Sequence, residues 1–308
     1  MQAFHSDAHS LALPPGHRFP QSKYRLLRER LERDPGPLRL TPAEAATESE
    51  LALVHTPDYL DAVLLGRLSA AQQREIGFPW SPTMAERSRR SVGATIMAAR
   101  AALAEGVAAN LAGGTHHAYA DKGSGYCVFN DVAVAARLMQ TEWQGSHRQL
   151  LRVLVIDLDV HQGNGTAAIF RDDESVFTFS MHGAKNFPFR KEASDLDVEL
   201  PDGCSDEPYL AALDQALDQV WRRCAPQLAF YLAGADPHEG DRLGRLKLSD
   251  AGLRERDRRV LQQLRERGIP VALSMAGGYG HDLNTTVAVQ VNTLSEAGLS
   301  WAHWRSDR

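Results

Sequence analysis

The chain has 308 residues, 43% hydrophobic and 24% charged, values typical of a globular protein with a sizeable core. Its formal net charge of −5 lacks the basic excess that nucleic-acid binding needs, so we predict no nucleic-acid partner. No apolar run reaches the roughly 18 residues of a membrane span, and the N-terminus lacks the apolar stretch of a signal peptide, so we expect a cytoplasmic protein.

Four segments have the apolar spacing of amphipathic helices. In chain order they are residues 24–33, 86–106, 206–223 and 249–268. Ser249 is expected to be the N-cap of the last one, and Gly268 to end it.

Five apolar runs are too short for helices and lie between or after the helical segments. They are residues 107–111, 153–156, 176–179, 228–232 and 271–275. Continuous apolar strands that alternate with helices are typical of a parallel sheet covered on both faces. Because neither a repeat nor a linker divides the chain, we predict an α/β fold with one domain over residues 1–308.

The chain has three cysteines, Cys127, Cys204 and Cys224. An odd number without a Cys-x-x-Cys pair fits neither a disulfide framework nor a cysteine zinc site. We expect free thiols.

Four of the apolar runs are followed by polar motifs. In a parallel sheet, ligands bind beyond the carboxyl ends of the strands, so these motifs are expected to meet at one edge. In chain order they are Gly113-Gly114-Thr115-His116-His117, Asp157-Leu158-Asp159-Val160-His161-Gln162-Gly163-Asn164-Gly165, Gly234-Ala235-Asp236 and Gly277-Gly278-Tyr279.

The second motif has the residues of a metal site. If the strand continues through it, Asp157, Asp159 and His161 point to the same face, where carboxylates need a cation to offset their repulsion. Asp159 and His161 with Asp236 make three ligands, an open set that is typical of catalytic zinc. The same donors also suit Fe(II), Co(II) or Mn(II).

The other two motifs supply groups for acid–base chemistry. His116 and His117 follow two glycines, and imidazole titrates near neutral pH, so both are candidates for general acid–base catalysis. The hydroxyl of Tyr279 can donate a hydrogen bond to an oxygen that becomes negatively charged. A tyrosine in a glycine-rich loop is also often only a packing residue.

Together these motifs resemble the zinc-dependent histone deacetylase family, which has an arginase-like fold. The similarity runs from about His17 to the end of the chain. Two further features look most like the class IV branch of the family and its bacterial relatives: the Gln162 and Asn164 variant of the second motif, and the run Gly240-Asp241-Arg242-Leu243-Gly244.

The resemblance implies amide hydrolysis by a metal-activated water. Asp159, His161 and Asp236 would bind zinc, with Fe²⁺ as an alternative metal. His117 would act as general base and then acid, beside His116. Tyr279 would stabilise the oxyanion.

The resemblance also implies further sites. A structural potassium ion would be bound by Asp157, which also orients His116, together with Ser180 and the backbone near Met181. The substrate-binding residues would be Gly125, Tyr126, Phe187 and Leu243, with the two aromatic rings lining a narrow acyl-lysine tunnel.

Two residues depart from the family pattern. Asn164 replaces a carboxylate that many class I members carry behind the second histidine, and should raise the pKa of His117 less than an aspartate would. Ala276 replaces a glycine and could alter the pocket floor. Arginase-type two-manganese chemistry is not expected, because Gly163 stands where its second carboxylate would be.

Three functions remain open at this point. The first is removal of acetyl or long-chain fatty acyl groups from lysine of a protein or peptide. The second is hydrolysis of acetylpolyamines, for which Glu239 and Asp241 are candidate acidic gatekeepers of the tunnel. The third, a binding module that has lost catalysis, is least favoured because the polar positions that the chemistry needs are filled.

Overall fold

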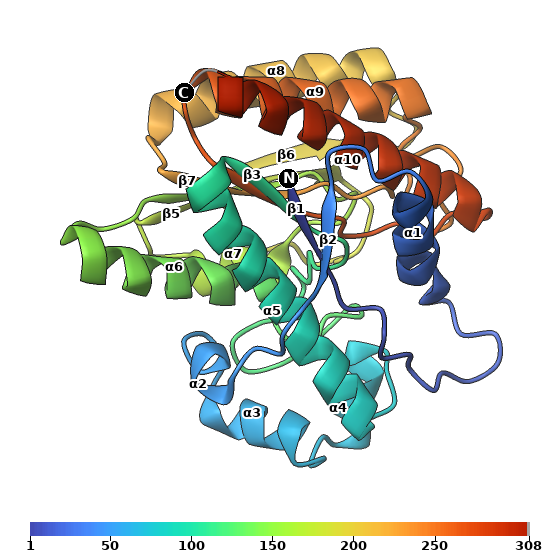
Figure 1. Cartoon of the computed structure of the whole chain (residues 1–308). Coiled ribbons are helices and arrows are strands. Elements are labelled where there is room, and N and C mark those ends of the chain that lie inside the picture. The colour runs from blue at the N-terminus through green and yellow to red at the C-terminus, as the bar shows by residue number, and fades with distance from the viewer. Residues whose placement is uncertain (307–308) are drawn as a thin grey trace.

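The computed structural model describes residues 1–306, in which eight parallel strands form one sheet (Figure 1). The strand order is β2-β1-β3-β8-β7-β4-β5-β6. In chain order the strands are β1 Gln2–His5, β2 Arg39–Pro42, β3 Val107–Asn110, β4 Val153–Asp157, β5 Val176–Gly183, β6 Leu196–Leu200, β7 Leu228–Leu232 and β8 Val271–Ser274.

Helices cover both faces of the sheet, and the shorter α2 to α4 lie beyond one end of α5 (Figure 1). Helices α8, α9 and α10 lie together over one face, while α5 and α6 contact each other on the opposite side. In chain order the helices are α1 Ser22–Arg33, α2 Glu48–Leu51, α3 Pro57–Leu64, α4 Ala70–Ile76, α5 Pro82–Glu105, α6 Asp131–His147, α7 Asn164–Phe170, α8 Asp206–Arg223, α9 Asp250–Glu266 and α10 Leu283–Ser306.

Two hydrophobic cores lie on the two faces of the sheet. Along β4, Val153 and Val155 belong to the core shared with α5 and α6, whereas Leu154 and Ile156 belong to the core shared with α8 and α9. This alternation is the period of two that a strand imposes. It explains why central strands with two buried faces appear in the sequence as uninterrupted apolar runs.

The predicted fold class is confirmed: an α/β domain with a parallel sheet between helical layers. All five expected strands and all four expected helices are present, with ends that differ by a few residues. Ser249 is the N-cap of α9, and its hydroxyl accepts a hydrogen bond from Gly252 N at 3.1 Å. Gly268 follows the end of this helix with a φ of 66°.

The elements that the sequence analysis missed are mostly short or lie at the sheet edges. Strands β1, β2 and β6 have four or five residues, and β2 and β6 are the two edge strands. Helix α10 was also missed, because its apolar residues are not confined to one side. All three cysteines are free, and within residues 1–306 no helix is long and apolar enough to cross a bilayer.

Candidate active site

The four polar motifs meet because their strands are consecutive neighbours. Strands β3, β8, β7 and β4 lie side by side in this order at the centre of the sheet. All four are parallel, so their carboxyl ends share one edge. The loops that follow them carry the two histidines, Tyr279, Asp236 and the Asp-x-Asp-x-His motif.

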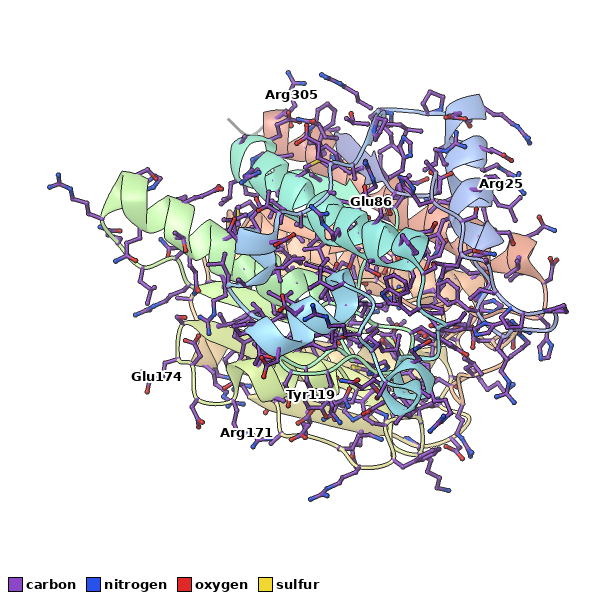
Figure 2. The ribbon with its side chains drawn as sticks, turned by 90° about the horizontal axis from the view of Figure 1, so that it is seen from below. Arg25, Glu86, Tyr119, Arg171, Glu174 and Arg305 are labelled. Carbon is purple, nitrogen blue, oxygen red and sulfur yellow. The ribbon has the colours of Figure 1, made fainter. Side chains whose placement is uncertain are left out.

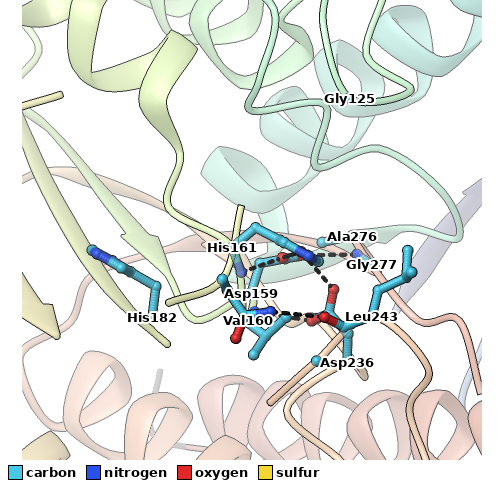
Figure 3. Close-up of polar contacts among 12 residues, drawn as sticks. Gly125, Asp159, Val160, His161, His182, Asp236, Leu243, Ala276 and Gly277 are labelled. Carbon is cyan, nitrogen blue, oxygen red and sulfur yellow. Dashed lines mark hydrogen bonds and ion pairs between the residues drawn. The ribbon is translucent and has the colours of Figure 1, made fainter. Parts of the chain in front are cut away.

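Asp159, His161 and Asp236 form a buried cluster whose ligand atoms all lie within 4.8 Å of one another. His161 Nδ1 lies 3.0 Å from Asp159 Oδ1 and 3.3 Å from Asp236 Oδ2 (Figure 3). The three side chains are at most 9% exposed. Two carboxylates and an imidazole therefore converge on one point away from solvent.

Strand β4 does not continue through the Asp-x-Asp-x-His motif, so the prediction that a strand points these three side chains to one face was wrong. Strand β4 ends at Asp157. The residues after it form a turn that is held by hydrogen bonds from backbone amides to aspartate carboxylates. Asp159 N donates to Asp157 Oδ1 at 3.2 Å, and His161 N donates to Asp159 Oδ1 at 2.9 Å. These local bonds, typical of aspartate in turns, bring the alternate side chains together.

Backbone amides of neighbouring loops hold the two carboxylates of the cluster in place. Gly277 N donates to Asp159 Oδ2 at 2.7 Å, and Val160 N donates to Asp236 Oδ1 at 3.0 Å (Figure 3). A Cβ at position 277 would lie 1.9 Å from Asp236 Oδ2, so only glycine fits there. The backbone thus leaves the other carboxylate oxygens directed toward His161.

The cluster fits a divalent cation. Asp236 Oδ2 is buried and makes no hydrogen bond, which is costly for a carboxylate oxygen without a cation. Burial and the nearby Asp159 carboxylate raise the pKa of Asp236 to about 7, a sign that the negative charge here is incompletely balanced. Two carboxylates and one imidazole are the ligand types of an open zinc site, and they also suit Fe(II) or Mn(II).

His116 pairs with Asp157 beside this cluster. Its Nδ1 lies 2.6 Å from Asp157 Oδ2, and both side chains are buried. Burial alone would lower the pKa of His116, but the carboxylates of Asp157 and Asp159 outweigh it and raise the pKa to about 9. His116 is therefore held as a cation.

His117 has the opposite character. Burial and the positive charges of His116 and His161 lower the pKa of His117 well below its usual value. Its Nδ1 lies 2.7 Å from Asn164 Oδ1, and Asn164 Nδ2 donates to the hydroxyl of Tyr119 at 2.9 Å. Since Asn164 Oδ1 only accepts, His117 carries its proton on Nδ1 and keeps the Nε2 lone pair free.

Tyr279 faces the cluster from the loop after β8. Its ring centroid lies 6.4 Å from that of His161, and both residues line one cavity with His116 and His117. Burial raises the pKa of Tyr279 well above its usual value, so its hydroxyl stays protonated and can donate a hydrogen bond. Asp241 Oδ2 positions this residue by accepting from Tyr279 N at 2.6 Å.

The substrate-binding candidates lie at different distances from the histidines. The ring of Phe187 packs edge-on against that of His117, with 4.9 Å between the two ring centroids. A Cβ added at Gly125 would lie 2.6 Å from His117 Cδ2. Tyr126 is half-buried, and its ring lies 6.0 Å from that of Tyr279. Leu243 lies on the other side of the metal-ligand cluster from His182 (Figure 3).

The potassium candidates are adjacent. Asp157 and Ser180 are register partners on β4 and β5, and Met181 follows directly. Ser180 Oγ lies 2.9 Å from His182 Nδ1. A ligand role for this hydroxyl would therefore compete with its bond to His182.

Residues 17–294 match the histone deacetylase domain. The chain belongs to the histone deacetylase family. It is accordingly a hydrolase that acts on acetylated amides, as the resemblance implied.

Relatives support this assignment over most of the chain. A protein of Picosynechococcus sp. is 45% identical over 89% of this chain and 91% of its own length. Histone deacetylase 2 of Arabidopsis thaliana is 34% identical over 82% of this chain and 67% of its own. The human polyamine deacetylase HDAC10 is 32% identical over 83% of this chain and 41% of its own.

The fold agrees with that of solved structures. A histone deacetylase homologue from Aquifex aeolicus superposes with a TM-score of 0.81 at 25% identity, covering 96% of this chain and 83% of that one. A structure of such a homologue complexed with SAHA gives a TM-score of 0.80, also at 25% identity, over 97% of this chain and 83% of that one.

Several supporting residues of this deacetylase site were missed in the sequence. Buried Asp131, the first residue of α6, accepts hydrogen bonds from Gly114 N at 3.0 Å and Thr115 N at 2.7 Å, which fixes the loop before His116. Arg256 is fully buried and donates to Gly234 O at 2.7 Å. A single sequence carries no signal for such contacts, because each partner lies far away in the chain.

Proposed function

We propose that the chain is a zinc-dependent deacylase that removes acetyl and longer acyl groups from the side-chain nitrogen of lysine in a protein or peptide. The observation that carries this proposal is the convergence of Asp159, His161 and Asp236 beside one neutral histidine, His117, and one protonated tyrosine, Tyr279. These are the parts that amide hydrolysis needs: a cation site, a base and a donor to the oxyanion.

A divalent ion at the three ligands would acidify water and polarise the amide carbonyl. His117 Nε2 is free to take a proton from the attacking water and to return it to the departing amine. The Tyr279 hydroxyl would donate to the carbonyl oxygen as negative charge grows there, a contribution of about 3 kcal/mol. His116, held as a cation by Asp157, keeps the pKa of His117 low.

We also propose a structural potassium ion beside Asp157, Ser180 and the Met181 carbonyl. The pairing of Asp157 with Ser180 across β4 and β5 supports it. Fe²⁺ is an alternative catalytic metal, since the ligand set suits both ions. The cytoplasmic location stays a prediction.

Charges near the tunnel residues favour a peptide over a polyamine. Of the two candidate gatekeepers, Glu239 is exposed, but Asp241 is not free, because its carboxylate accepts from the backbone of Tyr279, Leu243 and Gly244. Arg18 and Arg242 are both exposed, and the Arg242 guanidinium donates to Tyr279 O at 2.8 Å and to Arg18 O at 3.4 Å. Two guanidinium groups at this end of the site would repel a cationic polyamine.

The test is a turnover series on the zinc-loaded protein with acetyl-lysine, butyryl-lysine and myristoyl-lysine peptides and with acetylspermidine. We expect the highest kcat/KM on a lysine peptide. Highest turnover on acetylspermidine would instead favour the polyamine function, to which the human relative's name points. No turnover on any of the four would favour a non-catalytic binding role.

A further inference from the structure

The run Gly240-Asp241-Arg242-Leu243-Gly244 borders the candidate active site, although none of its residues is a proposed metal ligand, base or oxyanion donor. A Cβ at Gly244 would lie 2.1 Å from the backbone oxygen of Asp236, so this end of the run packs directly against a metal-ligand loop. Leu243 lies close to Asp236 in Figure 3. The middle of the run contacts the loop that carries Tyr279.

Two consecutive residues of this run bind the two backbone polar groups of Tyr279. Tyr279 N donates to Asp241 Oδ2 at 2.6 Å. Tyr279 O accepts from Arg242 Nε at 2.8 Å and from Arg242 N at 3.3 Å. Asp241 also forms an antiparallel bridge with Gly280. The backbone of the proposed oxyanion donor is therefore held on both sides by one loop.

Arg242 also reaches a third loop. Its Nη2 donates to Arg18 O at 3.4 Å. Arg18 lies in the segment before α1, the helix on which Arg25 is labelled in Figure 2. A guanidinium carries five N–H donors in a rigid plane, so it can bridge two carbonyls in a fixed geometry. One side chain thus connects the loops that contain Arg18, Arg242 and Tyr279.

The loop around Tyr279 has a conformation that needs such support. Ala276 has a φ of 47° and Gly278 a φ of 146°, and glycine gives the backbone wide conformational freedom. The carbonyls of Ala276 and Gly278 accept from buried Lys23 at 3.1 Å and 3.2 Å. The carbonyl of Tyr279 accepts instead from the exposed guanidinium of Arg242.

The position of this backbone matters for the proposed chemistry. A donor stabilises an oxyanion only when it lies within hydrogen-bond distance of the charged oxygen, and a misplacement of about 1 Å can cost 100-fold in rate. The Tyr279 hydroxyl lies at the far end of its side chain. A small shift or rotation of the backbone at Tyr279 therefore moves the hydroxyl by a larger distance.

We propose that Arg242 is a positioning residue for Tyr279, which it holds by its hydrogen bond to the Tyr279 carbonyl while it links this loop to the loop of Arg18. The proposal rests on the proposed function, because it takes Tyr279 as the oxyanion donor. Arg242 acts through Tyr279 and makes no contact with the reacting amide.

A double-mutant cycle on the full-length metal-loaded protein tests this coupling. Arg242→Ala should lower kcat on an acetyl-lysine peptide about tenfold, with KM near that of the wild type and the metal retained. In the Tyr279→Phe background, which lacks the hydroxyl, the same change should lower kcat less than about twofold. A tenfold loss in both backgrounds would overturn the proposal, because Arg242 would then act by another route. So would a raised KM with unchanged kcat, which would indicate contact with substrate.

Hydrogen exchange tests the clamp without using activity. The segment of residues 276–281 should exchange its backbone amides about tenfold faster in Arg242→Ala than in the wild type. Unchanged exchange in this segment of a folded Arg242→Ala would contradict the proposal. If exchange accelerates but the wild type cleaves no acyl-lysine, the clamp stands and the proposed function fails.

Two further variants serve as controls. Arg245→Ala removes a nearby exposed guanidinium that pairs with Asp202 at 3.1 Å, and both kcat and exchange should stay as in the wild type. Arg242→Lys keeps the charge without the planar fork, so both quantities should lie between those of the wild type and Arg242→Ala. If Arg242→Ala does not fold, Arg242→Lys carries the same measurements. Recovery of kcat in Arg242→Lys without recovery of slow exchange would indicate an effect of charge alone and would refute the clamp.

Discussion

His116 and His117 are adjacent in the chain, yet their pKa values move in opposite directions. The partner of each Nδ1 contributes to this difference, since His116 faces the Asp157 carboxylate and His117 faces the Asn164 amide. The charged His116 then lowers the pKa of His117 further. The result is one neutral imidazole beside one positively charged imidazole.

Asn164→Asp should alter this arrangement in a measurable way. A carboxylate beside His117 Nδ1 raises the pKa of this histidine, so the neutral base is lost at a higher pH. The acidic limb of the pH profile of kcat/KM should move up by about one pH unit. An acidic limb that stays in place in Asn164→Asp would show that His117 is not the base.

Tyr279→Phe should separate chemistry from metal binding. The variant lacks the proposed donor to the oxyanion but keeps Asp159, His161 and Asp236, so it should retain the metal and lose turnover by roughly 100-fold. Metal analysis and kcat on an acetyl-lysine peptide check both parts. Near wild-type kcat would remove the oxyanion role.

Most site residues could be chosen from the sequence because they follow apolar strands in long motifs. Asp159, His161 and Asp236 were predicted as ligands, and they converge. What the sequence could not show is how they are held. Asp157 ends its strand, and the turn beyond it is held by a hydrogen bond from Gly277 N to Asp159 Oδ2, two residues that lie 118 positions apart in the chain.

At the scale of elements, helix α9 supports two of the site loops. Arg256 projects from it and donates to Gly234 O at 2.7 Å, just before Asp236. The same guanidinium lies 3.4 Å from Leu158 O and pairs with Asp257 at 2.8 Å. The loops after β7 and β4 are therefore tied to one buried cation.

Arg256→Met should destabilise the fold and loosen the metal site. Loss of the arginine leaves the buried Asp257 carboxylate without its counter-ion, a cost of about 3–5 kcal/mol in the free energy of unfolding. Urea unfolding measures this cost, and a chelator titration measures metal retention. The double variant Arg256→Met/Asp257→Leu should recover part of the stability but not the metal affinity.

If Arg256→Met unfolded at the same urea concentration as the wild type, the buried pair would contribute little. If its stability fell while metal affinity stayed the same, α9 would stabilise the fold without positioning the ligands. Either result would contradict the role given to this helix.

Over the whole molecule, the sequence was most informative for the centre of the sheet and least informative at its edges. Strands β3, β4, β7 and β8 have both faces buried and appear as apolar runs. Edge strand β2 has exposed and half-buried residues, so its sequence resembles a loop. The N-terminal segment that forms β1 was not predicted as a strand, although it pairs with β3 beside the core.

Acid should destabilise the molecule partly through buried His55, whose ring contacts the backbone of Ala120 and Asn130. Burial lowers the pKa of His55 to about 4, against 6.5 in an unfolded chain. The unfolded state therefore binds the extra proton first, so the contribution is intact above pH 6.5 and is lost as the pH falls toward 4. Between pH 7.5 and 5 this amounts to about 2 kcal/mol.

His55→Asn isolates that contribution. The variant cannot take up the proton, so its unfolding free energy should fall about 2 kcal/mol less than that of the wild type over the same pH interval. Other titrating groups are common to both proteins and cancel in the comparison. Equal pH dependence in the two proteins would show that His55 is not held neutral by the fold.

Metal content compared with amide hydrolysis tests the central claim most directly. We predict that the purified wild type binds one divalent ion per chain and hydrolyses an acetyl-lysine peptide, and that Asp236→Ala loses both together. Asp241→Asn, which alters a nearby carboxylate outside the cluster, should keep the ion. A wild type that hydrolyses the peptide after complete removal of the metal, or an Asp236→Ala protein that retains metal and turnover, would contradict the account.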